Sequence, residues 1–149
     1  MGDLLDLGCG YGPIAITLAL RSPAARVWAI DVNERALALC KENARRAGSE
    51  NVRAVLPDQV PEHVHLASIY SNPPVRIGKA GLHELLTAWL DRLLPEGHAY
   101  LVVQRNLGAD SLVRWLGERG HPVTRLRSRT GYRVLDVHAS PDSNHHDSQ

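Results

Sequence analysis

Short apolar runs alternate along this chain with longer segments in which apolar residues recur every three or four positions. The strand-like runs lie at residues 4–7, 27–32, 52–56, 66–70 and 99–103. The helical patterns lie at residues 14–20, 34–47, 82–94 and 112–119. Strands that alternate with helices in this way form right-handed strand–helix–strand units. The pattern therefore predicts a doubly wound α/β fold with a mostly parallel sheet.

Turn residues between these segments mark their boundaries. Asn33 can cap the helix predicted at 34–47, and Gly48 can end it in a left-handed conformation. Pro95-Glu96-Gly97 predicts a turn before the strand at 99–103. Near the end of the chain, Thr130-Gly131 separates two runs at 123–129 and 132–138, which predicts an antiparallel hairpin. A terminal hairpin departs from a dinucleotide-binding Rossmann fold.

The length of 149 residues suits one domain, which we place at residues 1–139. Residues 140–149 have no apolar period, and we expect a disordered tail there. His145 and His146 in this tail are candidates for adventitious metal binding, and a solvated tail is the alternative.

Composition describes an ordinary globular protein, with 44% hydrophobic residues, 22% charged residues and a net charge of +1. The apolar runs are far shorter than the roughly 20 residues of a membrane span. The two cysteines make no disulfide framework and no signal-type segment opens the chain, so we expect a cytoplasmic, reducing environment. The charge is uneven, because residues 105–133 hold seven arginines but only Asp110 and Glu118 as acids.

A glycine-rich loop follows the first predicted strand. In the sequence Asp6-Leu7-Gly8-Cys9-Gly10-Tyr11-Gly12, the three alternate glycines allow a sharp turn and a close approach to a ligand. The next helix begins near Pro13 and points its N-terminal amides toward that ligand, which suits a carboxylate or a phosphate. The dinucleotide fingerprint needs a glycine where this chain has Pro13 or Ala15, which disfavours NAD.

Two acidic residues follow the second and third predicted strands. Asp31 is placed to accept hydrogen bonds from both hydroxyls of a ribose, because Asn33 already serves as the helix cap. Asp58 can reach an adenine edge or simply form a turn before Pro61, and the sequence leaves both open. Cys9 and Cys40 are interpreted as small buried hydrophobes rather than nucleophiles.

The segment Ser71-Asn72-Pro73-Pro74 follows the fourth predicted strand. Its prolines fix the backbone and so hold a side-chain amide in place. An ordinary turn is the alternative interpretation. Together with the glycine loop, the segment indicates methyl transfer from S-adenosylmethionine to a planar nitrogen.

With these motifs, the chain from Leu4 to Val137 resembles class I methyltransferases of the small-domain type, and most of all the RsmC-like ribosomal RNA guanine-N2 methyltransferases. The resemblance implies a Rossmann-like methyltransferase sheet and S-adenosylmethionine as cofactor. It also assigns the following cofactor-binding residues: Asp6, Gly8, Cys9, Gly10, Gly12, Asp31, Asp58 and Asn72. Members of this family carry a segment before the first strand, which this chain is expected to lack.

The resemblance makes Asn72, Pro73 and Pro74 the catalytic turn. An exocyclic amine has its lone pair delocalised into the base and needs reorientation. The Asn72 amide oxygen and the Pro73 carbonyl can each accept one of its N–H bonds and localise the lone pair. Adenine and glutamine methyltransferases usually carry an aromatic residue after the diproline, whereas this chain has Val75, which favours guanine N2.

Basic residues are candidates for binding the RNA backbone. Arg76 and Lys79 follow the catalytic turn, and surface charges without a task are the alternative. Arg125, Arg127 and Arg129 alternate along the hairpin, so a period of two predicts one common face. The alternative is a sheet edge protected from aggregation.

Three tryptophans, Trp28, Trp89 and Trp115, lie in apolar segments and are expected in the core.

The leading hypothesis is an RNA methyltransferase that modifies guanine N2 in ribosomal RNA, with the RNA or a ribosomal subunit as partner. One alternative is a non-catalytic RNA-binding or assembly module that keeps the fold. Another is a methyltransferase that acts on a protein or a small molecule.

Overall fold

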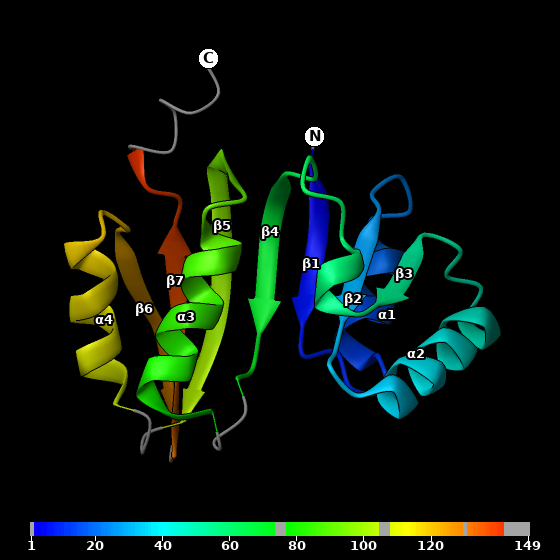
Figure 1. The fold of residues 1–149 in the computed structure, drawn as a ribbon, viewed down its shortest axis with the longest axis horizontal. Coiled ribbons are helices and arrows are strands. Elements are labelled where there is room, and N and C mark those ends of the chain that lie inside the picture. The colour runs from blue at the N-terminus through cyan, green and yellow to red at the C-terminus, as the bar shows by residue number, and fades with distance from the viewer. Residues whose placement is uncertain (1, 74–76, 105–107, 130, 142–149) are drawn as a thin grey trace. The chain divides into compact units, whose positions relative to one another are not determined.

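The computed structural model describes residues 2–73, 77–104, 108–129 and 131–141, without the side chains of residues 127–129. The elements follow in the order β1 (Asp3–Leu7), α1 (Pro13–Arg21), β2 (Val27–Ile30), α2 (Glu34–Ala47), β3 (Val52–Val55), η1 (Pro57–Gln59), β4 (Leu66–Ser71), α3 (Gly78–Leu90), β5 (Leu93–Gln104), α4 (Ala109–Glu118), β6 (Val123–Arg129) and β7 (Tyr132–His138) (Figure 1).

The strands take the order β3-β2-β1-β4-β5-β7-β6 in a seven-stranded sheet that is mostly parallel, with antiparallel strands at its C-terminal end. The predicted fold class is confirmed. The chain divides into two compact units, Met1–Ile69 and Tyr70–Gln149. Within the described residues, no helix is long and apolar enough to cross a membrane. The end of the domain at residue 139 stays a prediction, and the tail from 142 onward lies outside the described residues.

In the first unit, β1, β2 and β3 pair in parallel, and α1 and α2 cover an apolar cluster built on these strands. The predicted boundaries hold at both ends of α2. The Asn33 side chain accepts hydrogen bonds from the amides of Arg35 and Ala36, and Gly48 adopts a left-handed conformation with φ of 74°. These caps fix where α2 starts and stops.

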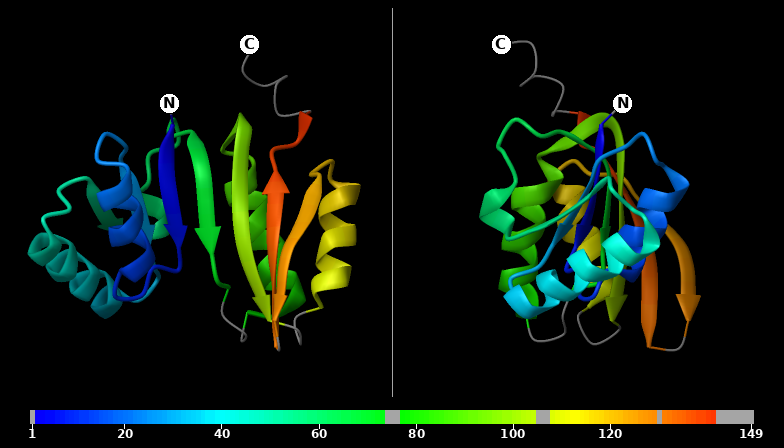
Figure 2. Two further views of the ribbon diagram at one scale, coloured as in Figure 1. Left: turned by 180° about the vertical axis from the view of Figure 1, so that it is seen from behind. Right: turned by 90° about the vertical axis from the view of Figure 1, so that its right-hand side faces the viewer.

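In the second unit, β5, β7 and β6 form an antiparallel group. The hairpin between β6 and β7 has the predicted bounds. The helices α3 and α4 lie on one face of these strands, as Figures 1 and 2 show from opposite sides. Alternate strand residues, namely Ala99, Leu101, Val103, Leu135 and Val137, are fully buried, while their neighbours are half-buried. This alternation assigns the apolar residues to the helix-covered face.

Several boundaries differ from the sequence-based predictions, and α3 and β5 begin at Gly78 and Leu93 and not at residues 82 and 99. The strand β2 ends at Ile30 and not at residue 32, and α3 ends at Leu90 and not at residue 94. Pro95-Glu96-Gly97 lies inside β5, so the predicted turn is wrong. Proline lacks an N–H, but the pairing of β5 with β7 begins only at His98, and Pro95 therefore removes no hydrogen bond from that ladder.

The core predictions for tryptophan hold for two of the three residues. Trp28 and Trp89 are buried. Trp115 is half-buried, and its ring stacks on the ring of His83 at a centroid distance of 3.9 Å. This contact joins α4 to α3 at the surface of the second unit.

Candidate functional site

The glycine loop lies in the first unit, between β1 and α1. Gly8, Gly10 and Gly12 have φ values of 84°, 56° and 100°, which residues other than glycine rarely adopt. The amides of Gly8 and Cys9 both donate to the carbonyl of Ile30 at 2.8 Å. These bonds anchor the loop to the end of β2, so its conformation is held by the parallel sheet.

Gly12 has a second reason to be glycine. A Cβ built there lies 2.7 Å from the Cys40 Sγ, which is closer than such atoms approach. At Gly8 and Gly10, in contrast, a Cβ meets no atom within 4 Å. The loop is thus pressed against α2 at Gly12 and faces open space at Gly8 and Gly10, where a ligand can approach the backbone.

Asp31 follows β2 and holds the loop from the other side. Its Oδ2 accepts the amide of Gly10 at 3.0 Å, and its Oδ1 accepts the amide of Asn33 at 2.9 Å. A carboxylate offers about four acceptor positions. Asp31 therefore supports the loop and keeps acceptor capacity for two hydroxyl groups, as the ribose role requires.

Asp6 is the second carboxylate of the loop and is 2% exposed. Its Oδ2 accepts the amide of Ala15 at 3.0 Å, near the N-terminus of α1. Burial raises the pKa of Asp6 to about 6; the bond from Ala15 lowers it and the charge of Asp31 raises it. Two carboxylates at this helix end oppose a bound phosphate and favour a ligand that carries positive charge.

Cys9 and Cys40 are both buried, as interpreted from the sequence. Their thiols share a hydrogen bond, and this bond together with burial raises the pKa of Cys9. A thiol with a raised pKa stays protonated and is a poor nucleophile. The same hydrogen bond lowers the pKa of Cys40, but that thiol is fully buried and out of reach of a substrate. We therefore interpret the pair as packing α2 against the loop.

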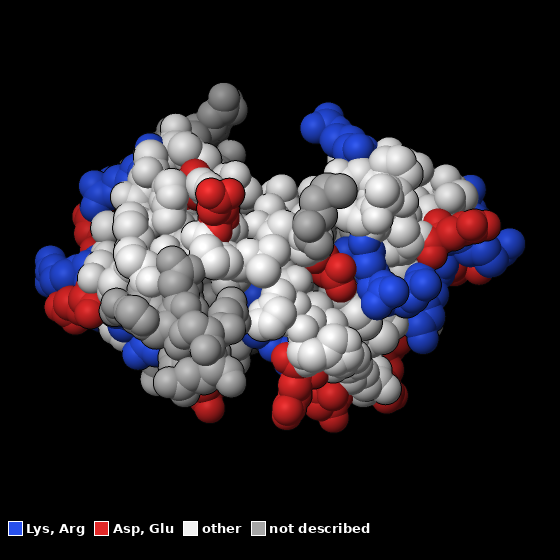
Figure 3. All heavy atoms as spheres, turned by 90° about the horizontal axis from the view of Figure 1, so that it is seen from above, with Lys and Arg blue, Asp and Glu red and all other residues white. Residues whose placement is uncertain are grey.

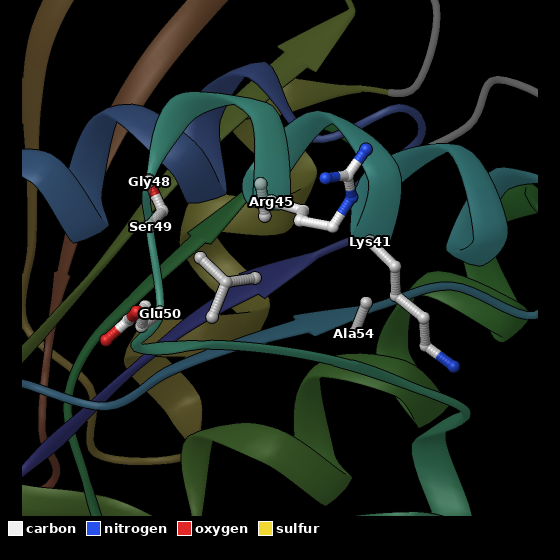
Figure 4. A pocket seen from close by; sticks show the side chains of 8 residues that line it. Lys41, Arg45, Gly48, Ser49, Glu50 and Ala54 are labelled. Carbon is white, nitrogen blue, oxygen red and sulfur yellow. The ribbon is translucent and has the colours of Figure 1, made fainter.

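Asp58 is exposed in the 3₁₀ turn η1, which follows β3. The Gln59 side chain accepts the amide of Leu56 and caps this turn. A shallow hollow of about 380 Å³ in the same unit is lined by the end of α2 and the start of β3, including Lys41, Arg45 and Ser49 (Figure 4). None of the predicted cofactor residues lines this hollow, so it is separate from the candidate site.

In the second unit, Asn72 and Pro73 follow β4 directly. Asn72 is exposed and Pro73 is buried. The buried Pro73 thus anchors the backbone, while the side-chain amide of Asn72 is exposed to solvent. Lys79 is exposed in the first turn of α3. Pro74 and Arg76, also predicted as site residues, lie outside the described residues.

The predicted row of hairpin arginines is interrupted. Arg125 pairs with Leu135 in the register but Arg127 pairs with Val134, so a bulge lies between them. A bulge breaks the two-residue alternation on which the prediction of one common face rested, and that part of the prediction is wrong. Arg125 forms an ion pair of 2.9 Å with Asp110 of α4. The side chains of Arg127 and Arg129 lie outside the described residues.

Charges are mixed on the face shown in Figure 3, where lysine and arginine side chains are interspersed with acidic ones over the described residues.

Comparison with known proteins identifies the family. The model of the methyltransferase small domain matches residues 1–136. The chain belongs to this family. It is an S-adenosylmethionine-dependent methyltransferase related to enzymes that methylate ribosomal RNA.

Two relatives and one solved structure illustrate the similarity. The uncharacterized protein YbxB of Bacillus subtilis is 36% identical over 137 residues, which cover 90% of this methyltransferase and 68% of YbxB. Ribosomal RNA small subunit methyltransferase C of Mannheimia succiniciproducens is 35% identical over 145 residues, covering 91% of this chain and 41% of that protein. The T. thermophilus 16S rRNA N2 G1207 methyltransferase, solved with AdoMet and guanosine, has a TM-score of 0.76 over 91% of this chain and 37% of its own. Its identity of 22% shows the fold alone.

The residues of the glycine loop fit S-adenosylmethionine. The ligand carries a positive sulfur, a ribose and no phosphate. Asp6 and Asp31 supply negative charge, Asp31 retains acceptor capacity for hydroxyls, and Gly8 and Gly10 leave the backbone open to approach. The Ala15 amide near the N-terminus of α1 already donates to the Asp6 carboxylate. It is therefore not free to bind the pyrophosphate of a dinucleotide.

Sequence reasoning did not identify two further residues at this loop. The Asn43 side chain donates to the carbonyl of Tyr11 at 2.9 Å and ties α2 to the loop. Val32, directly after Asp31, is 81% exposed. The structure shows this exposed apolar side chain beside the candidate ribose-binding residue Asp31, whereas the sequence alone places Val32 in a strand.

Proposed function

We propose that this methyltransferase modifies the exocyclic N2 of a guanine in RNA, with ribosomal RNA as the substrate class. The observation that carries the proposal is the outward-facing Asn72 on a buried Pro73, in a sequence that the guanine-N2 family uses as its substrate motif. The related rRNA methyltransferase of M. succiniciproducens supports the choice of RNA.

The cofactor role falls to residues of the first unit. When bound, S-adenosylmethionine supplies an electrophilic methyl group on a positively charged sulfur. Asp31 accepts the ribose hydroxyls, Asp6 adds negative charge near the sulfonium, and the backbone at Gly8 and Gly10 lies along the ligand. Val32 covers the base with apolar surface, and Asp58 accepts from the adenine amine.

The substrate role falls to residues of the second unit. The Asn72 amide oxygen and the Pro73 carbonyl each accept one N–H bond of the guanine amine, which turns its lone pair out of conjugation. The amine nitrogen would bond to the methyl carbon as the bond between that carbon and the sulfonium sulfur breaks, with its electron pair staying on sulfur in the departing S-adenosylhomocysteine. The amine then loses one proton to water. Lys79 and Arg125, together with Arg76, Arg127 and Arg129, bind phosphates of the RNA.

A paired experiment tests both roles. Asn72→Ala is expected to leave S-adenosylmethionine affinity within about twofold while the methylation rate falls about 10²–10³-fold, by analogy with an oxyanion-hole donor. Asn72→Asp keeps an acceptor and should retain more of the rate. Asp31→Ala removes a charged acceptor, so affinity for S-adenosylmethionine should fall by roughly 10- to 100-fold.

Binding is measured by calorimetry and product by mass spectrometry of nucleosides from methylated rRNA. Methylated guanine at N2 is the expected product. A full rate for Asn72→Ala removes the catalytic assignment. Methyl transfer only to protein or to a free amine removes the RNA assignment, and failure of the native chain to bind S-adenosylmethionine favours the non-catalytic module.

A further inference from the structure

Polar residues gather on one face of the antiparallel strands in the second unit, opposite the face covered by α3 and α4. The register pairs His98 with His138 and Tyr100 with Asp136. Residues that face each other across an antiparallel ladder project to the same side, as do residues two apart in a strand. All four residues therefore share the face of β5 and β7 that is turned toward the viewer in Figure 2, left.

Three of these side chains converge. The His98 Nδ1 lies 2.8 Å from the Asp136 Oδ1, and the His138 Nε2 lies 3.9 Å from the Asp136 Oδ2. The two imidazole rings are 4.4 Å apart between centroids. One ligand atom from each of the three residues lies within 4.8 Å of the other two. The carboxylate thus stands between two imidazoles, with one oxygen toward each.

This donor set matches the preference of zinc, which binds imidazole nitrogen and carboxylate oxygen at about 2.0–2.2 Å. In a tetrahedral site, ligand atoms at those distances lie about 3.3 Å from one another. The observed separations bracket that value, so small side-chain rotations bring all three atoms into place. The backbone needs no movement, because hydrogen bonds of the ladder already hold β5 against β7.

We propose that His98, Asp136 and His138 form a Zn²⁺ site that fastens β5 to β7. Zinc binding replaces the hydrogen bond between His98 and Asp136, and the three protein ligands leave a fourth position for water. The side chains are 34%, 14% and 39% exposed, so the ion is reached directly from solvent. The site uses no residue of the glycine loop or of the Asn72 turn and is independent of the proposed methyl transfer.

A cross-strand hydrogen bond without a metal is the competing explanation. In that explanation the register alone brings His138 beside the other two residues, and its contact with the carboxylate at 3.9 Å is too long for a hydrogen bond. Zinc binding requires all three side chains, whereas the hydrogen bond requires only two. Removal of His138 therefore separates the two explanations.

The test uses the full chain with His145→Gln and His146→Gln, because those two tail histidines are candidates for adventitious binding. Zn²⁺ is titrated by calorimetry, and Co²⁺ by its visible absorption. We expect one ion per chain and, at 100 times the dissociation constant, a rise in Tm of roughly 5–10 °C. His98→Gln, Asp136→Asn and His138→Gln should each weaken binding at least tenfold, in line with the loss of one of three ligands.

A matched control is His63→Gln with His65→Gln, two exposed histidines of the first unit, and it should bind zinc as the parent does. Thermal melts in the presence of a chelator show whether each variant is folded. Of the three substitutions, His138→Gln is expected to disturb the fold least, because its side chain is the most exposed. No Zn²⁺ binding by the parent overturns the proposal. Unchanged binding by folded His138→Gln, or loss of binding in the control, overturns it as well.

Discussion

The glycine loop and the β5–β7 face show two ways in which a chain builds a polar site. In the loop, a continuous stretch of sequence carries the chemistry, and its glycines and Asp6 lie within seven residues. On the β5–β7 face, His98 and His138 are forty residues apart and meet only because the register pairs them. A local motif is therefore visible in the sequence, whereas a cross-strand cluster becomes visible only when the register is known.

The two regions also differ in how their glycines are constrained. Gly12 in the loop and Gly131 in the hairpin turn both have positive φ, of 100° and 92°. At Gly12 a Cβ would meet the Cys40 Sγ at 2.7 Å, whereas at Gly131 nothing lies within 4 Å. The loop thus combines backbone strain with a close contact, and the hairpin has the strain alone.

Alanine at each position measures this difference. We expect Gly12→Ala to destabilise the fold by about 3–5 kcal/mol, because strain and overpacking add. Gly131→Ala should cost about 1–2 kcal/mol from strain alone. Urea unfolding of the two variants gives both values.

Cys40→Ala in the Gly12→Ala background serves as the control. It removes the Sγ and should recover the part of the loss that comes from the contact, beyond its own effect in the native background. Equal costs for the two glycine variants, or no recovery on removal of the Cys40 Sγ, would show that the contact does not constrain the loop.

The sequence predicted the loop well because its determinants are local. The caps of α2, the start of α1 at Pro13 and the bounds of the hairpin all follow from single residues with strong backbone preferences. The turn at Pro95 failed because proline is compatible with a strand where no partner needs its N–H. The common face of the arginines failed because one bulge residue, invisible in the sequence, shifts the register after Arg125.

The candidate site divides in the same way. The sequence named Asp31 and Asp6, but their hydrogen bonds to Gly10 and Ala15 needed the structure. Asn43 was missed because a side chain that binds the carbonyl of Tyr11 from 32 residues away leaves no pattern in a single sequence. The exposure of Val32 was missed because apolar residues at strand ends are usually counted with the core.

Asp6 provides a test of the loop by pH. Burial raises its folded pKa from 3.8 to about 6, so between pH 4 and 6 the folded chain holds a proton that the unfolded chain has lost. Folding stability should therefore fall by about 2–3 kcal/mol across that window and change no further above it.

In the Asp6→Asn variant the side chain at position 6 is neutral at every pH, so this variant does not lose folding stability as the pH rises from 4 to 6. The difference in unfolding free energy between Asp6→Asn and the native chain should therefore grow by about 2–3 kcal/mol from pH 4 to pH 7, as measured by urea unfolding. Asp91→Asn, which changes an exposed aspartate, is the matched control and should run parallel to the native chain. Parallel curves for Asp6→Asn would remove the assignment of a destabilising buried charge.

The smallest effect on stability is expected in the hairpin, at Arg125. Its ion pair with Asp110 is 2.9 Å long, but the two side chains are 50% and 69% exposed, so water screens the interaction. Exposed pairs of this kind contribute about 0.2–1 kcal/mol. Arg125→Ser should accordingly leave the unfolding free energy within about 0.5 kcal/mol of the native value, in contrast to the variants of the glycine loop.

The same substitution should still alter RNA binding if Arg125 contacts a phosphate. Each lost phosphate contact lowers the slope of log affinity against log salt by about 0.7–0.9. Asp110→Ala serves as the matched variant, because it breaks the same ion pair but leaves the arginine available to RNA, and its slope should equal or exceed the native one. An unaltered slope for Arg125→Ser would show that this arginine forms the exposed ion pair with Asp110 and contacts no phosphate. The charge at this position of the hairpin, unlike the carboxylates of the glycine loop, would then have no ligand to bind.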